Sequence, residues 1–256
     1  MTERFRDFVN CCTAIPTRLP LVHTTDWYVF RNLMDTDKIL RPQLCPVFGE
    51  ELTYLFYGKP CYRKHIDSDP NSISAFYSVG IIFEPSVFTD YKRAFPFDTG
   101  AFASGYYNAS LHPDMEIEHF SITPNRDSAA RTVATFYDTN ESYFRGMLRG
   151  DINPPASEIE VSAFLSIAGT AAMTPADDRR SAIEVQIDRD IQLTSANVEA
   201  IILPEQLLDD PSIMSFIEID LAAEPLDYIC PHARPSEDAR AILTEAKRFC
   251  KAKGYL

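Results

Sequence analysis

The sequence lacks the cysteine patterns of zinc-binding and disulfide-stapled proteins. Its six cysteines include no CxxC pair and repeat no metal-ligand spacing. The Walker loop, GxGxxG, HExxH and GxSxG motifs are also missing, which argues against several large enzyme classes. We therefore expect reduced structural thiols and no bound metal.

Long apolar runs are absent as well. Charged residues occur throughout the first seven positions, so neither a secretory signal nor a transmembrane helix is predicted, and we expect a cytoplasmic protein with no membrane contact. The chain has no internal repeat and no Gly/Ser linker. Because 45% of its residues are hydrophobic, we expect one domain over residues 1–256, with a possible seam at Pro154-Pro155.

Positive charge is scarce relative to negative charge. The chain has 24 Lys and Arg against 37 Asp and Glu, a formal net charge of -13. Such a field repels phosphates at long range, so nonspecific binding of nucleic acid is disfavoured. A local cationic groove remains compatible with a small anionic ligand such as a dinucleotide.

Hydrophobic periodicity and turn residues predict an α+β fold. Asp26 is expected to cap the helix that follows the first strand, and the aromatic region 88–108 is expected to form an ordered surface loop beside a binding site. Strands are predicted over 20–25, 51–57, 75–83, 180–187, 198–203 and 216–221. Helices are predicted over 1–12, 27–34, 127–148, 157–167, 205–208 and 236–251, with Asp127 and Ser157 as candidate caps of the third and fourth.

Two early segments carry candidate binding residues. His23 and Thr24 end the first predicted strand and precede a helix and the short apolar turn at 39–42. The alternative is that His23 binds no ligand and is simply a polar residue at the strand end whose hydrogen bonds are made within the protein.

A second candidate segment spans 56–63, where an aromatic strand ends in a turn. Lys59 and Arg63 flank Tyr62, so the segment offers a cationic edge beside an aromatic wall that includes Tyr57. The alternative is a core strand with Tyr57 buried and Lys59 and Arg63 in solvent.

The late segment 180–186 carries a candidate catalytic carboxylate. Strand alternation places Glu184 on the face opposite Ile183 and Val185, which fits an active-site acid or a solvent-facing strand residue equally well. Residues 95–102 have no comparable assignment: Asp98, Thr99 and Gly100 fit either a simple turn or a substrate-facing loop.

In order and spacing these segments resemble the ADP-ribosyltransferase superfamily, and within it the DNA-modifying toxin branch often called DarT-like. The resemblance covers residues 21–204 and implies a mixed, largely antiparallel sheet flanked by helices. It implies NAD as substrate, held by His23, Thr24, Tyr57, Lys59, Tyr62 and Arg63. It implies Glu184 as the group that stabilises the oxocarbenium-like charge when nicotinamide departs.

Three functions stay open at this point. The leading one is transfer of ADP-ribose to an acceptor that the sequence does not identify. The others are hydrolysis of NAD as a glycohydrolase and a non-catalytic interaction or sensor role on the same fold. A toxin or antiviral-defence setting follows only from the resemblance.

Overall fold

The computed structural model describes residues 4–61, 73–170, 177–230 and 235–256. A central sheet runs in the order β10-β9-β5-β1-β4-β7-β6, with β3 paired to β4. All of its pairings are antiparallel except β9 with β10, which confirms the α+β class with a mostly antiparallel sheet. The strands are β1 (Leu21–Asp26), β3 (Gln43–Leu44), β4 (Glu51–Tyr57), β5 (Ser78–Phe83), β6 (Arg93–Phe95), β7 (Glu184–Ile187), β9 (Val198–Pro204) and β10 (Glu224–Tyr228). A separate ribbon pairs β2 (Ile39–Leu40) with β8 (Ile191–Gln192).

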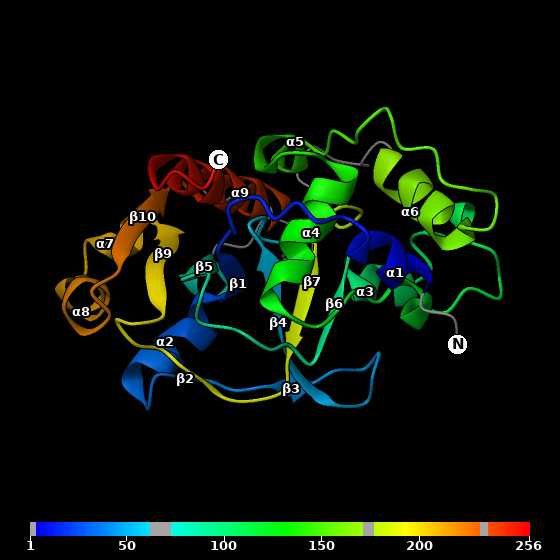
Figure 1. Ribbon diagram of the computed structural model, residues 1–256. Coiled ribbons are helices and arrows are strands. Elements are labelled where there is room, and N and C mark those ends of the chain that lie inside the picture. The colour runs from blue at the N-terminus through cyan, green and yellow to red at the C-terminus, as the bar shows by residue number, and fades with distance from the viewer. Residues whose placement is uncertain (1–3, 62–72, 171–176, 231–234) are drawn as a thin grey trace.

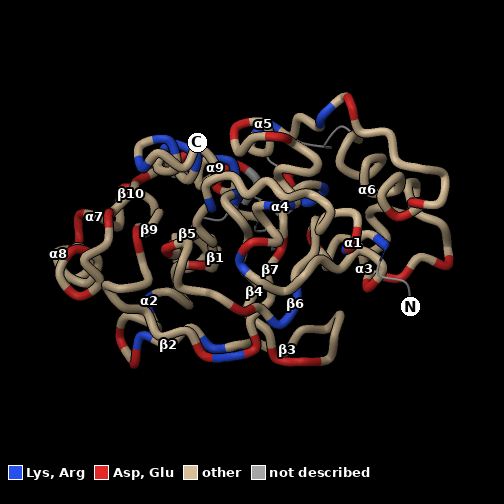
Figure 2. Tube along the Cα trace, in the orientation of Figure 1, with Lys and Arg blue, Asp and Glu red and all other residues tan. Residues whose placement is uncertain are grey.

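Helices cover the sheet in two groups (Figure 1). The C-terminal helix α9 packs on β5, β9 and β10, whereas α1 packs against α4 and α6, and α1 and α6 lie toward the β6 side of the sheet. The helices are α1 (Arg4–Asn10), α2 (Trp27–Asp35), α3 (Thr99–Ala103), α4 (Arg126–Phe136), α5 (Asn140–Phe144), α6 (Ile159–Gly169), α7 (Glu205–Leu208), α8 (Pro211–Ser215) and α9 (Pro235–Ala252). Figure 2 shows Lys and Arg gathered along α9 and acidic residues around α7 and α8.

The core follows from the apolar runs of the sequence. All six residues of β5 are buried because the strand lies between β9 and β1 and α9 packs against it. Beside β6 the core is aromatic: the rings of Phe136 and Phe164 lie 4.6 Å apart and those of Phe97 and Phe120 lie 5.2 Å apart. Strands from both sides of Pro154-Pro155 share the one sheet.

Several sequence predictions are confirmed. Asp26 caps α2, since its carboxylate accepts a hydrogen bond of 2.9 Å from the Val29 amide. The strand over 51–57 and the short helix over 205–208 have the predicted bounds. Gly254, just past α9, has a φ of 77°, the left-handed geometry that commonly ends a helix.

Other predictions are wrong for local reasons. The helix predicted over 127–148 is interrupted by Asp138, whose φ is 70°, and its cap is Asn125, which accepts from two amides. The helix predicted from Ser157 begins at Ile159, after Glu158. Residues 216–221 form a π-helical turn in place of a strand, and β10 follows it.

The region 88–108 is not a simple loop. It contributes β6 to the sheet and also contains the short helix α3. β6 has only three residues, and alternation of apolar and polar residues cannot be recognised over so short a stretch. The sequence therefore did not predict this strand.

Candidate functional site

A cavity of about 780 Å³ lies against the sheet, lined mainly by residues between His23 and Cys61 and completed by Asp98, Gly100 and Glu184. Its lining comes from β1, from α2 and the segment that follows it, from β4, and from the start of α3 and of β7. Its polar lining residues include His23, Tyr54, Asp98 and Glu184, and the last three lie close enough for their charges to affect one another's pKa. His23 and Glu184, taken as candidates from distant parts of the sequence, therefore border one cavity.

Strand register explains why these side chains share a face. Glu184 pairs directly with Phe56 of β4, and Gln186 pairs with Tyr54. Directly opposed residues of an antiparallel pair lie on the same side of the sheet. Both Tyr54 and Phe56 line the cavity, and the intervening Leu55 belongs to the main hydrophobic core.

Glu184 is buried, with 1% of its surface exposed, and is held by three donors. One carboxylate oxygen accepts from the Thr99 amide at 2.9 Å, and the other accepts from the Thr99 hydroxyl at 2.7 Å and the Gln186 side-chain amide at 2.8 Å. Burial, followed by the nearby negative charge of Asp98, raises the pKa of Glu184 to about 8 in spite of these donors. The solvent-facing alternative for Glu184 is wrong.

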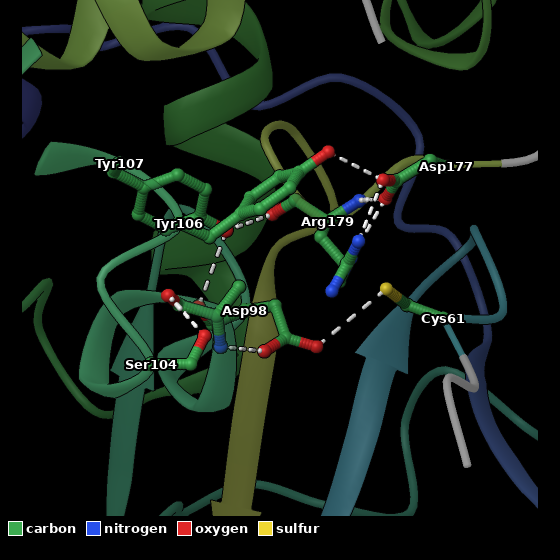
Figure 3. A network of polar contacts seen from close by, with 8 residues as sticks. Cys61, Asp98, Ser104, Tyr106, Tyr107, Asp177 and Arg179 are labelled. Atoms are coloured by element: carbon green, nitrogen blue, oxygen red, sulfur yellow. Dashed lines mark hydrogen bonds and ion pairs between the residues drawn. The ribbon is translucent and has the colours of Figure 1, made fainter. Parts of the chain in front are cut away.

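Asp98 is fixed by the turn that starts α3. One of its oxygens accepts from the Ala101 amide at 2.7 Å, and the other lies 3.8 Å from the Cys61 sulfur, which also lines the cavity. Figure 3 shows this carboxylate pointing toward Cys61. Two carboxyl groups, Asp98 and Glu184, thus border the same end of the cavity on an ordered backbone.

A second layer of contacts holds that turn in place (Figure 3). The Tyr107 hydroxyl donates to the backbone carbonyl of Arg179 at 2.7 Å, and the Tyr106 hydroxyl donates to Asp177 at 2.6 Å. Asp177 also pairs with the Arg179 guanidinium at 2.8 Å. The Asp98 amide donates to the Arg179 carbonyl at 3.0 Å, so the α3 turn is tied to the segment that leads into β7.

His23 is oriented by a backbone contact. Its Nδ1 lies 2.9 Å from the carbonyl oxygen of Tyr54. Since a carbonyl only accepts, Nδ1 carries the proton, and Nε2 of the neutral ring is left as an acceptor. Burial lowers the pKa of His23, which favours that neutral form.

The other residues predicted to bind a ligand divide into three groups. Thr24 lines the cavity, and Tyr62 and Arg63 lie outside the described residues. Tyr57 and Lys59 do not line it.

Tyr57 lies in the main core, where its hydroxyl accepts from the Leu19 amide at 2.9 Å, because strand alternation turns it away from Phe56. Lys59 is fully buried after the turn at Gly58, whose φ is 67°. The alternative of a solvated Lys59 is therefore also wrong.

Acidic residues outnumber basic ones in the described lining. Asp26, Asp98 and Glu184 are acidic, whereas Arg41 is its one Lys or Arg within the described part of the chain and pairs with Asp37. This end of the cavity suits a neutral sugar or a cationic ring. Among the described residues, no group of three His, Cys, Asp or Glu side chains is placed to hold a metal ion.

Sequence reasoning did not assign Asp98 and Thr99 to the site. The residue types Asp-Thr-Gly indicate a turn and a helix cap, which is how Asp98 acts here. Their contact with Glu184 joins positions far apart in the sequence, so no local pattern signals it.

The chain matches no protein-family model, and searches of curated proteins and of solved structures find no similar protein. Among the described helices, none has the length and apolar character needed to cross a membrane.

Proposed function

We propose that the protein consumes NAD, cleaving the bond between nicotinamide and ribose and transferring ADP-ribose to an acceptor. The observation that carries this proposal is that His23 and Glu184 border one cavity, with the aromatic rings of Tyr54 and Phe56 beside them. The acidic lining favours the positively charged nicotinamide ring of NAD at this end.

Glu184 would act on the developing charge. When the C–N bond breaks, its electron pair passes to the ring nitrogen, and the ribose becomes oxocarbenium-like. A carboxylate fixed by Thr99 and Gln186 needs little rearrangement to stabilise that charge. The ionised form of Glu184 is the active one, and binding of the cationic ring favours it.

His23 would position the substrate. With its proton on Nδ1, the ring presents Nε2 to a ribose hydroxyl, which donates to it. The fixed ring orientation places the ribose relative to Glu184. His23 is therefore a binding and orienting residue in this proposal.

The nature of the acceptor follows in part from charge. A net charge of -13 disfavours nucleic acid, so water or a neutral or basic protein is the better acceptor. Transfer to water would make the protein an NAD glycohydrolase, and Asp98 in the same cavity is a carboxylate able to accept the water proton.

The proposal is tested by incubating the protein with NAD and measuring nicotinamide by chromatography, with labelled NAD to detect modified macromolecules. His23→Gln should lower kcat/KM about tenfold, as expected for one substrate hydrogen bond. His112→Gln is the matched control, since His112 is exposed and does not line the cavity. Absence of nicotinamide release from the wild type would reject the enzyme in favour of an interaction or sensor protein.

A further inference from the structure

A second cavity, of about 460 Å³, is lined in part by the segment that precedes β7, residues 177–181. Its lining includes Arg145, Asp178, Arg180 and Ser181, and it shares no lining residue with the NAD-site cavity. Polar groups dominate this lining, so the cavity suits a small polar molecule.

Ser181 borders this cavity and contacts a buried lysine. Its hydroxyl oxygen lies 2.8 Å from the Lys59 Nζ, and Lys59 has no exposed surface. The Lys59 amine also lies 4.4 Å from the centre of the Tyr143 ring and 3.5 Å from Asp178. A serine that touches a desolvated lysine is the arrangement of a nucleophile and its base.

Burial and Asp178 shift the pKa of Lys59 in opposite directions. Full burial lowers its pKa, and this effect exceeds the opposing one of Asp178. Asp178 is 20% exposed, so solvent screens part of its charge. The lowered pKa makes the Lys59 amine easier to deprotonate, and once deprotonated the amine lies 2.8 Å from the Ser181 oxygen and can accept its proton.

Arg180 supplies a cation to the same cavity. Its guanidinium lies 4.5 Å from the centre of the Tyr106 ring, and its Nε is buried without a hydrogen bond in the described part of the chain. No carboxylate among the described residues forms an ion pair with it. Arg180 is thus available to a carboxylate on a ligand.

We propose that Ser181 and Lys59 form a nucleophile–base pair that hydrolyses small esters whose acyl group carries a carboxylate, with Arg180 binding that carboxylate. The Ser181 oxygen attacks the ester carbonyl and its proton passes to the Lys59 amine. The bond to the alcohol then breaks, and the alcohol leaves with that proton. Water attacks the acyl-serine, gives its proton to Lys59, and releases the acid as Ser181 regains the proton. The net reaction is ester plus water to acid plus alcohol.

A fluorophosphonate probe tests the nucleophile directly, with the adduct located by mass spectrometry of the intact chain and of its peptides. One adduct on Ser181 is expected, and it should disappear in Ser181→Ala but persist in Ser128→Ala. Ser128 is a buried serine whose hydroxyl donates to the Asn125 carbonyl, away from any lysine contact. No adduct between about pH 7 and pH 9, or an adduct on another serine, would overturn the proposal.

Two further measurements test whether Lys59 acts as the base and whether Arg180 binds the substrate carboxylate, or whether these residues are only packed beside Ser181. Lys59→Met should slow labelling at least about tenfold, and unchanged labelling would overturn the base role. If Lys59→Met does not fold, the pH dependence of wild-type labelling decides, because a base requires the rate to rise as an amine loses its proton and a flat profile rejects it. Arg180→Met should remove the preference for the mono-p-nitrophenyl ester of succinic acid over p-nitrophenyl acetate, and an unchanged ratio would overturn the acyl assignment.

Discussion

Two buried ionisable groups, Glu184 in the lining of the first cavity and Lys59 behind Ser181 of the second, have different surroundings. Glu184 has three hydrogen-bond donors and a second carboxyl group, Asp98, near it. Lys59 has one hydroxyl and one partly exposed carboxylate, Asp178. Burial moves both groups toward their neutral forms, raising the pKa of Glu184 and lowering that of Lys59. The hydrogen-bond donors around Glu184 oppose the effect of burial and favour the carboxylate, whereas at Lys59 the effect of burial exceeds that of Asp178 and makes the amine easier to deprotonate.

The largest expected effect is on the pH dependence of stability. The pKa of Glu184 rises from 4.5 to about 8 on folding, so between these values the folded chain keeps a proton that the unfolded chain has lost. The free energy of unfolding should fall with pH across that window, by at most about 1.4 kcal/mol per pH unit from this group. Lys59 has the opposite sign: its lowered pKa adds stability as pH rises toward 10.5.

Urea unfolding from about pH 5 to pH 8 measures the first window. Glu184→Gln should flatten the fall, while Glu199→Gln, which alters a strand carboxylate outside the cavity, should retain most of it. An unchanged slope in Glu184→Gln would mean that Glu184 is ionised throughout.

The next largest effect is expected at Gly58, in the turn between the end of β4 and the buried Lys59. A Cβ there would lie 2.6 Å from the Leu19 Cδ1 and 3.1 Å from the Phe144 ring, on a backbone with a φ of 67°. Gly58→Ala should lower the free energy of unfolding by about 2 kcal/mol or more.

Gly49→Ala is its matched control. Gly49 has a φ of 66° but nothing within 4 Å of an added Cβ, so it reports backbone strain alone, about 1 kcal/mol. Both losses are measured by denaturant unfolding. An equal fall in the free energy of unfolding in the two variants would show that the Leu19 side chain moves away from the added Cβ without destabilising the protein.

The smallest effect is expected for Asp178→Asn. It should lower the free energy of unfolding by about 1 kcal/mol, because it weakens a single contact of 3.5 Å between the Lys59 Nζ and a carboxylate that solvent partly screens. It should also move the midpoint of Ser181 labelling to lower pH, since the anion that raises the pKa of Lys59 is gone. A loss of about 3–5 kcal/mol in denaturant unfolding would instead indicate a buried charged lysine left unpaired.

Much of the fold was predictable because its main elements carry local signals. β4 and α2 combine dense apolar residues with a clear boundary, Gly58 in one case and the Asp26 cap in the other. β6 and α3 are too short for a period to show, so a turn over Asp98, Thr99 and Gly100 was an open alternative but its contact with Glu184 was not predicted.

The site was predictable only where side-chain direction follows from the strand. Strand order brought His23 and Glu184 to one cavity, but Tyr57 follows the alternation into the core. The resemblance implied that Lys59 binds NAD, yet the turn at Gly58 carries it into the interior, where it contacts Ser181 and Asp178. Those contacts are tertiary and have no counterpart in the local sequence.

The most direct test of the account compares nicotinamide release by Glu184→Gln and Glu199→Gln with the wild type. The first substitution keeps the shape of the side chain but removes the charge that faces the oxocarbenium ion, so kcat should fall about 10²–10³-fold while NAD binding, measured by calorimetry, is retained. Glu199, which accepts from the Tyr255 hydroxyl at 2.8 Å on β9, does not line the cavity, and its variant should keep near wild-type turnover. Equal turnover in wild type and Glu184→Gln, or no release by the wild type, would contradict the central claim.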